Sequence, residues 1–323
     1  MIIDLVFLTK KIIKFLLSQW IPNSQMLISI YEKNGIKLHT RFFVIIFCVV
    51  VFSFGNAFAH DFSSDESIDF LTVVDKIKVE SKLVDDNAGK DGDQNFAKTH
   101  ANNAILYYDS DTKKEISEKN QRTAIELEDT LNKLLMEVES QKSESQISET
   151  VDTIESILDE AVTTRIDEEQ INNSTIQALV LANIIDTSLQ RYGDAFNIGI
   201  DLTNMSNMNQ NTTVYELLNQ GPSHFIYQNK YIVNFDEYES ALEFLNIALK
   251  KFYTEIFPSL SSQIEENDTK VQNYQDLENG LVDLKIAVEN REQPMKVMEI
   301  VHTKIHPNLQ VLFNLKLVDE NDI

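Results

Sequence analysis

Apolar residues recur at three- and four-residue steps along most of the chain after residue 60. Because an α-helix turns once every 3.6 residues, this spacing places the apolar side chains on one face and predicts amphipathic helices. Clear examples are Leu127, Leu131, Leu134 and Val138, followed by Ile147, Val151, Ile154 and Leu158. The pattern predicts helices at 65–84, 95–108, 113–140, 145–164, 174–193, 213–219, 235–257, 268–290 and 294–305, with a short helix after Pro307.

Glycine and proline separate these segments. The chain has 8 Gly and 5 Pro, and after residue 60 nearly all of them fall between periodic segments, which is typical of a helical protein. We expect an all-α fold, an elongated up-and-down helical bundle over residues 60–323. The stretch IQALVLANII, 176–185, is apolar almost all round and is expected to be the central helix. A short hairpin near 225–233 is the one place for extended structure, and a loop-rich linker before it suggests two helical halves, 60–195 and 223–323.

Residues 1–59 have a different character and are predicted to be an N-terminal extension with a signal peptide. An apolar run at 42–54 follows Arg41 and precedes Ala57 and Ala59, which is the order of regions in a cleavable secretory signal. The run is shorter than the ~20 residues of a transmembrane helix. We therefore expect cleavage after Ala59 and an exported, extracytoplasmic protein, secreted or held at the outer face of the cytoplasmic membrane. Residues 1–38, with a second apolar segment, leave two alternatives: a start codon assigned too far upstream, or an uncleaved amphipathic or membrane-inserted N-terminus.

The net charge of −23 changes the picture of possible partners. Cleavage after Ala59 would remove six basic and two acidic residues and leave a net charge of −27. A surface this acidic repels phosphate backbones and attracts cations. Nucleic acid is therefore excluded as a partner. The single cysteine, Cys48, would also be lost, which excludes a disulfide, a thiolate nucleophile and a cysteine metal site in the mature protein.

Signature motifs of enzymes are absent from the sequence. It has no glycine-rich phosphate loop, no Gly-x-Ser-x-Gly and no His-Glu-x-x-His. The acidic loop from Asp91 has Phe96 where a calcium-binding loop needs glycine and Asn102 where it needs glutamate. Since no nucleophile or acid–base pair can be named, we expect that the protein is not an enzyme.

The strongest candidate site is the segment EIVHTKIHPN. Glu299 and His302 are three residues apart, and His302 and His306 are four apart, so a helix would present all three on one face. Glu-x-x-His is a unit of carboxylate-bridged di-iron bundles, although such bundles need two copies and this chain has one. His306 also precedes Pro307, which disfavours helical geometry there and is expected to interrupt the face. The alternative is a pair of histidines that stabilises a helix end.

Two further histidines are candidate ligands. His100 lies on the same predicted helix face as Phe96 and Ala104, so it is expected to point inward. A weak similarity between 98–106 and 304–312 raises the hypothesis that His100 and His306 face each other across the bundle. Cleavage after Ala59 would give His60 a free α-amine beside its imidazole, and these two nitrogens are suited to copper.

The stretches HDFSSDESIDFLTVVDKIKVESKL, THANNAI, LDEAVTTRIDEEQINNSTIQALVLANIID and LVDLKIAVENREQPMKVMEIVHTKIHPNLQ resemble a group of exported, all-helical, uncharacterised proteins of ammonia-oxidising archaea. The chain is also similar, more distantly, to the helical extracytoplasmic domain of high-affinity iron permeases, although the permease's membrane helices and their Arg-Glu-Gly-Leu-Glu motif are missing. The first resemblance implies a location outside the cytoplasmic membrane. The second implies a metal-handling helper and a role for His100, Glu299, His302 and His306.

These observations lead to one expected function and one alternative. The expected function is an exported accessory protein that binds iron or copper and works with a membrane-bound metal transporter or another envelope protein. The alternative is a structural or partner-binding envelope protein that holds no metal and whose acidic faces are solvated surface. A membrane is expected as a partner only through residues 1–59, if they are not cleaved.

Overall fold

The computed structural model describes residues 64–89, 92–199, 201–203, 232–258, 260 and 268–315. They belong to one compact unit of the chain, Phe62–Ile323. The predicted extension 1–59 with His60, the helix at 213–219 and residues 225–231 of the predicted hairpin lie outside the described residues. Within 232–234 there is no strand, and the backbone N–H groups of Val233 and Asn234 donate to the carbonyl of Ala195 at 2.8 and 3.1 Å.

Every regular element in the described part of the chain is a helix, so the predicted all-α helical bundle is confirmed. Most helices begin and end within a few residues of the positions that the apolar pattern predicts. The elements are α4 (Ser64–Ala88), α5 (Gln94–Tyr107), α6 (Ser110–Lys119), α7 (Gln121–Glu139), α8 (Glu144–Arg165), α9 (Glu168–Ile171), α10 (Ser174–Ala195), α14 (Phe235–Lys251), the π-helical segment η2 (Phe252–Ile256), α16 (Asp268–Glu289), α17 (Pro294–Ile300), the π-helical segment η3 (Val301–Ile305) and α18 (His306–Phe313).

The predicted helix 113–140 is divided into α6 and α7 at Asn120, so that prediction is wrong. Asn120 has an extended backbone, with φ −149° and ψ 94°, which no residue inside a helix adopts. Its backbone N–H donates to the carbonyl of Ile116 at 2.8 Å and closes α6, while its side-chain oxygen accepts from the N–H of Thr123 at 3.3 Å and caps α7. Asparagine suits this position because its short side chain replaces a missing backbone partner.

The expected interruption at His306 is also wrong, because α17, η3 and α18 form one continuous helix through Pro307. His306 has helical φ −56° and ψ −45°, and its N–H donates to the carbonyl of Val301, five residues back. A proline in an α-helix lacks a donor and crowds the carbonyl four residues earlier. The wider π turn before Pro307 accommodates this ring, and the Asn308 side chain donates to the carbonyl of Lys304 at 2.7 Å.

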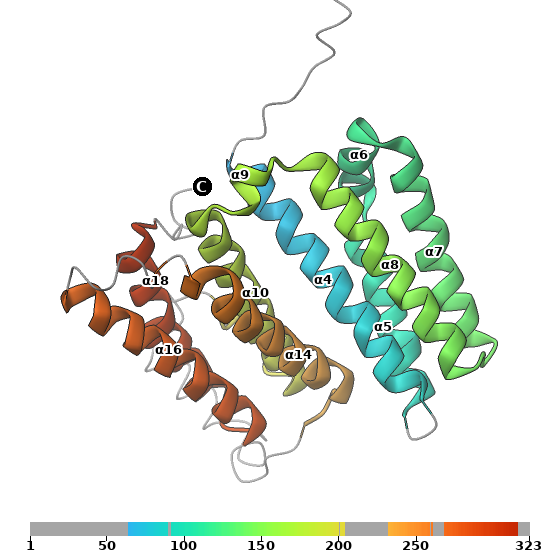
Figure 1. The fold of residues 1–323 in the computed structure, drawn as a ribbon. Helices are drawn as coiled ribbons and strands as arrows, with labels where there is room; N and C mark the ends of the chain where they lie inside the picture. Colours follow the sequence, from blue (N-terminus) through green and yellow to red (C-terminus); the bar gives the residue numbers. More distant parts are fainter. Residues whose placement is uncertain are drawn as a thin grey trace, which may run out of the picture. The chain divides into compact units, whose positions relative to one another are not determined.

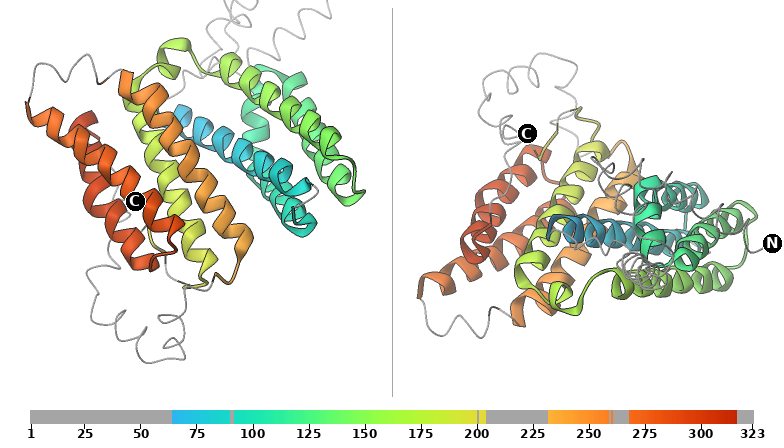
Figure 2. Two further views of the ribbon diagram at one scale, coloured as in Figure 1. Left: turned by 60° about the horizontal axis from the view of Figure 1, so that its bottom comes forward. Right: turned by 90° about the horizontal axis from the view of Figure 1, so that it is seen from above.

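Two groups of helices meet at α4 and α10 (Figure 1). The first group is α4, α5, α7 and α8, with α6 against α7 and α8. The second is α10, α14, α16 and the helix of α17, η3 and α18. Figure 2 shows α4 between these groups from two further sides, and α4 contacts both α10 and α14. As predicted, α10 is the central helix: it packs against α4, α14, η2, α17 and α18, and Leu181, Ile184 and Ile185 are fully buried.

Candidate functional site

Three polar side chains of α10 reach three separate clusters of titratable groups. Arg191 joins a cluster around His100, Gln177 joins one around Lys251, and Asp186 lies beside His306. Burying a polar group costs free energy unless the group is hydrogen-bonded, so nearly all buried polar groups in native proteins have partners. The completeness of pairing in each cluster therefore helps to separate a structural role from a functional one.

His100 on α5 is fully buried and forms the centre of a polar network with α4 and α14. Its Nδ1 lies 2.8 Å from Oε2 of Glu80, which is also fully buried, and its Nε2 lies 3.5 Å from Oε2 of Glu239. The hydroxyl of Ser240 donates to Oε1 of Glu80 at 3.0 Å, and the Asn103 amide donates to Oε2 at 3.3 Å. Both ring nitrogens of His100 and both carboxylate oxygens of Glu80 therefore have partners.

Arg191 extends this network to α10. Its Nη1 donates to the two carboxylate oxygens of Glu237 at 3.0 and 2.7 Å, and its Nη2 donates to the hydroxyl of Tyr107 at 2.6 Å. The same Nη2 lies 3.8 Å from Oε1 of Glu80. The network thus connects four helices, α4, α5, α10 and α14, through charged groups that compensate one another.

The charges of the network keep His100 protonated. Burial alone lowers the pKa of His100, but the hydrogen bonds to Glu239 and Glu80, together with their negative charges, raise it to about 9. A protonated imidazole donates from both nitrogens and has no lone pair for a metal ion. The arrangement favours a structural role for His100.

Lys251, the last residue of α14, is the centre of a second cluster, in which the charges are paired although Oδ2 of Asp75 is buried without a partner in hydrogen-bonding geometry among the described residues. Its Nζ donates to Oε1 of Gln177 at 3.0 Å and to the carboxylate of Glu255 at 2.8 Å, and lies 3.3 Å from Oδ2 of Asp75. Burial lowers the pKa of Lys251, but the charges of Asp75 and Glu255 outweigh it and raise the pKa, so the ammonium form is retained. This cluster connects α4, α10 and α14 beside η2.

His302 and His306 form the third cluster, in which several buried polar atoms lack hydrogen bonds. The side chains lie one helical turn apart, with ring centroids 5.2 Å apart and planes at 80°, an edge-to-face contact. His302 is 4% exposed, and its Nε2 lies 3.0 Å from the carbonyl oxygen of Leu202. Its Nδ1 is buried and has no hydrogen-bond partner among the residues that the structure describes.

The carbonyl of Leu202 determines which nitrogen of His302 carries the proton. A carbonyl only accepts, so Nε2 must be the donor, and in the neutral ring Nδ1 then has a free lone pair. Burial lowers the pKa of His302, more than the hydrogen bond to Leu202 raises it, which favours this neutral form. His302 therefore presents an unprotonated nitrogen inside the protein.

Asp186 faces the other histidine. Its Oδ1 lies 3.1 Å from Nε2 of His306, yet both atoms are buried and neither has a partner in hydrogen-bonding geometry. The unpartnered atoms of this cluster are thus Nδ1 of His302, Nε2 of His306 and Oδ1 of Asp186, contributed by η3, α18 and α10. Asp186 belongs to no motif and was not among the predicted ligands, although it is the one charged residue within the apolar run LVLANIIDTSL.

The other predicted site residues do not join this cluster. Glu299 is largely exposed, with its carboxylate 3.2 Å from Nζ of Lys296. The structure brings His302 and His306 together, whereas His100 lies in its own network with Glu80 and Glu239. His60 lies outside the described residues. Across the described ranges, no three His, Cys, Asp or Glu side chains are grouped in an arrangement that holds a metal ion as they stand.

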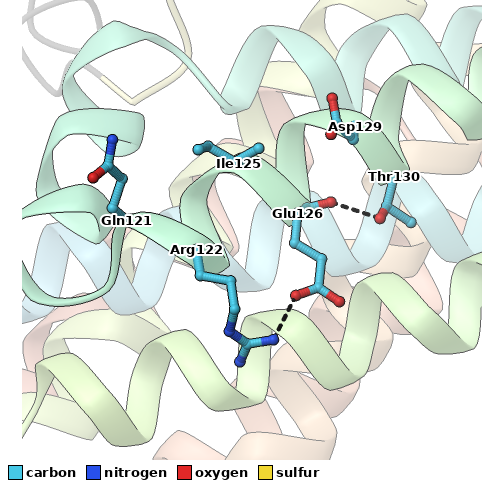
Figure 3. A pocket seen from close by; sticks show the side chains of 6 residues that line it. All are labelled: Gln121, Arg122, Ile125, Glu126, Asp129 and Thr130. Atoms are coloured by element: carbon cyan, nitrogen blue, oxygen red, sulfur yellow. Dashed lines mark hydrogen bonds and ion pairs between the residues drawn. The ribbon is translucent and has the colours of Figure 1, made fainter.

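A surface hollow of about 600 Å³ lies along α7, far along the chain from these histidines (Figure 3). It is lined by Gln121, Arg122, Ile125, Glu126, Asp129 and Thr130. Arg122 donates to the Glu126 carboxylate at 2.9 Å, and the Thr130 hydroxyl donates to the Glu126 carbonyl at 2.6 Å. Arg122 also donates to the Glu160 carboxylate of α8 at 2.7 Å, so these three side chains are paired with neighbouring protein groups, and this hollow is not the candidate site.

Comparisons with known proteins identify no relative, so a proposed function rests on the geometry of the His302–His306 cluster. No protein family, no curated protein and no solved structure matches this chain. None of the helices in the part of the chain that the structure describes is both long and apolar enough to span a membrane.

Proposed function

We propose that this chain is an exported helical protein of the cell envelope that binds a first-row transition metal ion, iron or copper, through His302 and His306. The supporting observation is the neutral imidazole of His302, whose N–H is bonded to the Leu202 carbonyl and whose Nδ1 has no partner. Metal-binding histidines are commonly held in this way, with one nitrogen donating to a carbonyl and the other facing the metal. Leaving a buried acceptor unpaired costs about 1–3 kcal/mol, which a bound ion would offset.

His306 supplies the second nitrogen in this proposal. Its ring lies against that of His302, and its Nε2 is likewise buried without a hydrogen bond. Imidazole is a good ligand for iron, copper, nickel and zinc, so the ligand type restricts the ion to this class without selecting one member. The π turn at Val301–Ile305 favours a functional reading, since single π turns inside α-helices occur frequently at functional sites.

The overall charge fits a protein that handles cations outside the cell. A net charge of −23 raises the local concentration of cations at the surface. In this proposal the chain is an accessory protein without enzymatic activity, which passes its ion to a membrane-bound transporter or another envelope protein. Residues 1–59 supply the export signal, or an anchor if they remain.

One observation favours the alternative, a partner-binding envelope protein without metal. Large apolar side chains are exposed on neighbouring elements: Val282 and Ile286 on α16 are 39% and 48% exposed, and Tyr253 on η2 is 43% exposed. The Tyr253 hydroxyl donates to the Glu278 carboxylate at 3.0 Å, which joins η2 to α16. Apolar side chains gathered at a surface are a feature of protein–protein contacts.

Metal retention distinguishes the two functions. The full-length protein is incubated with Fe(II) under anaerobic conditions, or with Cu(II), desalted and analysed for metal and protein. We expect close to one ion per chain in the native protein and a large loss in a His302→Ala/His306→Ala double variant. Failure of the native protein to retain either ion would favour the partner-binding alternative. Copper retained equally by the double variant would instead show that the ion is held outside the His302–His306 pair.

A further inference from the structure

We infer that Asp186 is the third ligand of this site, which makes it a site of two histidines and one carboxylate for a divalent first-row ion. The inference rests on the proposed function and goes beyond it, because it adds a residue 116 positions before His302 and narrows the class of ion. Asp186 comes from the central helix α10, whereas both histidines come from the last helix of the described chain.

The first argument is the distance between Asp186 and His306. Two ligand atoms each about 2.1 Å from one ion, at 90–110° to each other, lie about 3.0–3.4 Å apart. Oδ1 of Asp186 and Nε2 of His306 are 3.1 Å apart. An ordinary hydrogen bond of that length would also have the donor aimed at the acceptor, yet neither atom has a partner in such geometry.

The second argument is that three unpaired atoms of ligand type occur in neighbouring residues. Nδ1 of His302 belongs to a side chain that is 4% exposed, and the two atoms facing each other at Asp186 and His306 are also buried. Buried polar atoms without partners are few in native proteins. Here they belong to three residues linked by contacts, His302 with His306 and His306 with Asp186, and a ligand shared by all three would pair them.

The ligand types indicate the class of ion. Two imidazole nitrogens and one carboxylate oxygen form the set used by non-haem Fe(II) sites and by zinc sites with an open position. The set has no thiolate, so it has no preference for Cu(I). We therefore assign a divalent ion, and of the two metals in the proposed function Fe(II) fits this ligand set.

Ion binding requires a small rearrangement. Among the described residues no three such side chains are grouped as they stand, so Asp186 must turn toward His302, whose ring remains bonded to the Leu202 carbonyl through Nε2. Asp186 has the freedom for this, since its side chain is 32% exposed while that of His306 is 13% exposed.

Cobalt(II) is the probe for the test, because its visible absorption reports the number and type of its ligands. The full-length protein is titrated with Co(II) in four forms: native, Asp186→Asn, His306→Gln, and Glu299→Gln as the matched control from the same helix. We expect Asp186→Asn to weaken binding at least about 100-fold and to change the spectrum, since even partners behind the ligands are worth about 10–100-fold. Glu299→Gln should bind as the native protein does.

A second variant tests the same contact through the appearance of an absorption band instead of a loss of Co(II) binding. Asp186→Cys should create a thiolate-to-cobalt charge-transfer band in the near ultraviolet that native protein, with Cys48, does not show. This result remains informative if Asp186→Asn folds poorly, because the band appears only when residue 186 contacts the ion. Circular dichroism of each variant monitors folding.

The outcomes separate the inference from the proposed function. If Asp186→Asn binds Co(II) with native affinity and spectrum, or Asp186→Cys binds Co(II) without the new band, Asp186 is only an ion-pair partner of His306 and the inference is wrong. The proposed function then survives provided that His306→Gln loses binding. If native protein binds no Co(II), the inference is wrong, and the proposed function is then decided by the retention of Fe(II) or Cu(II).

Discussion

The His100 network and the His302–His306 cluster are both buried and both contain imidazole, but their pairing differs completely. Around His100 each ring nitrogen faces a carboxylate, and Glu80 accepts from His100, Ser240 and Asn103. Within the described ranges, the ring of His302 makes one hydrogen bond, to Leu202, and its Nδ1 has no partner. Complete pairing stabilises a fold, whereas incomplete pairing is a cost that a ligand can remove.

The two regions also differ in the protonation state of their histidine. Two carboxylates hold His100 in the protonated form, while burial next to a carbonyl holds His302 neutral. A protonated ring can only donate, and a neutral ring keeps a lone pair. The comparison therefore predicts that substitution of histidine by leucine costs much more stability at His100 than at His302.

The largest expected effect is the loss of stability in His100→Leu. It leaves the Glu80 carboxylate buried without its closest cationic partner, and breaking a buried charge pair in this way costs about 3–5 kcal/mol. Urea unfolding at pH 7 measures the change. Leu106→Ala on the same helix, at a side chain 73% exposed, serves as control and should change stability by less than about 0.5 kcal/mol. A loss below about 1 kcal/mol in His100→Leu would mean that the network is not structural.

The pH dependence of stability should report the same network. The pKa of His100 is raised from 6.5 to about 9, so its contribution is fully present below pH 6.5 and is lost as the pH rises through 9. Between these values the folded protein holds a proton that the unfolded chain has released, and stability falls by up to about 1.4 kcal/mol per pH unit. Urea unfolding from pH 6 to 10 tests this. The decline should persist in His302→Leu and flatten in His100→Gln, and an equal decline in both variants would contradict the assignment.

His302→Leu should have a smaller effect on stability than the substitution at His100. It removes one hydrogen bond to Leu202, worth about 0.5–1.5 kcal/mol, but also removes the unpaired Nδ1. We expect a net change of about 1 kcal/mol or less by urea unfolding without added metal, together with loss of metal retention. A destabilisation as large as that of His100→Leu would show that His302 is held by bonds of equal importance.

The smallest expected effect is that of Glu299→Gln. Glu299 is exposed and paired with Lys296, and exposed ion pairs contribute about 0–1 kcal/mol. We expect a change in stability within about 0.5 kcal/mol and unchanged metal retention. A clear loss of metal in this variant would restore the Glu-x-x-His interpretation of the sequence and weaken the case for Asp186.

The sequence predicted the fold well but the details of two helices poorly. The break at Asn120 was missed because residues 113–140 keep their periodicity across it, while the cap depends on the backbone of a single residue. The π turn before Pro307 was missed because a proline usually ends a helix, and local rules do not include the packing that holds this one together. Gly280 on α16 shows that packing: a Cβ there would lie 3.1 Å from Cβ of Lys304 in η3.

The candidate site was predicted only in part. The four-residue spacing of His302 and His306 identified the pair, since helical periodicity brings such residues together. Asp186 is distant in sequence and has no motif around it, so only the packing of α10 against α18 brings it to His306. Glu299 satisfied the spacing rule, yet three-residue spacing does not decide whether a side chain turns toward the core or toward solvent.

By itself the sequence determined that this chain is helical, where most helices lie and which of them is central, because apolar periodicity and scarce glycine and proline are local properties. Tertiary structure decided which buried polar groups are compensated. Glu80 and Glu239 reach His100 from two other helices, and no comparable set of partners reaches Nδ1 of His302. The physical reason is that the pairing of a buried group depends on contacts between helices far apart in the chain, which helix periodicity does not encode.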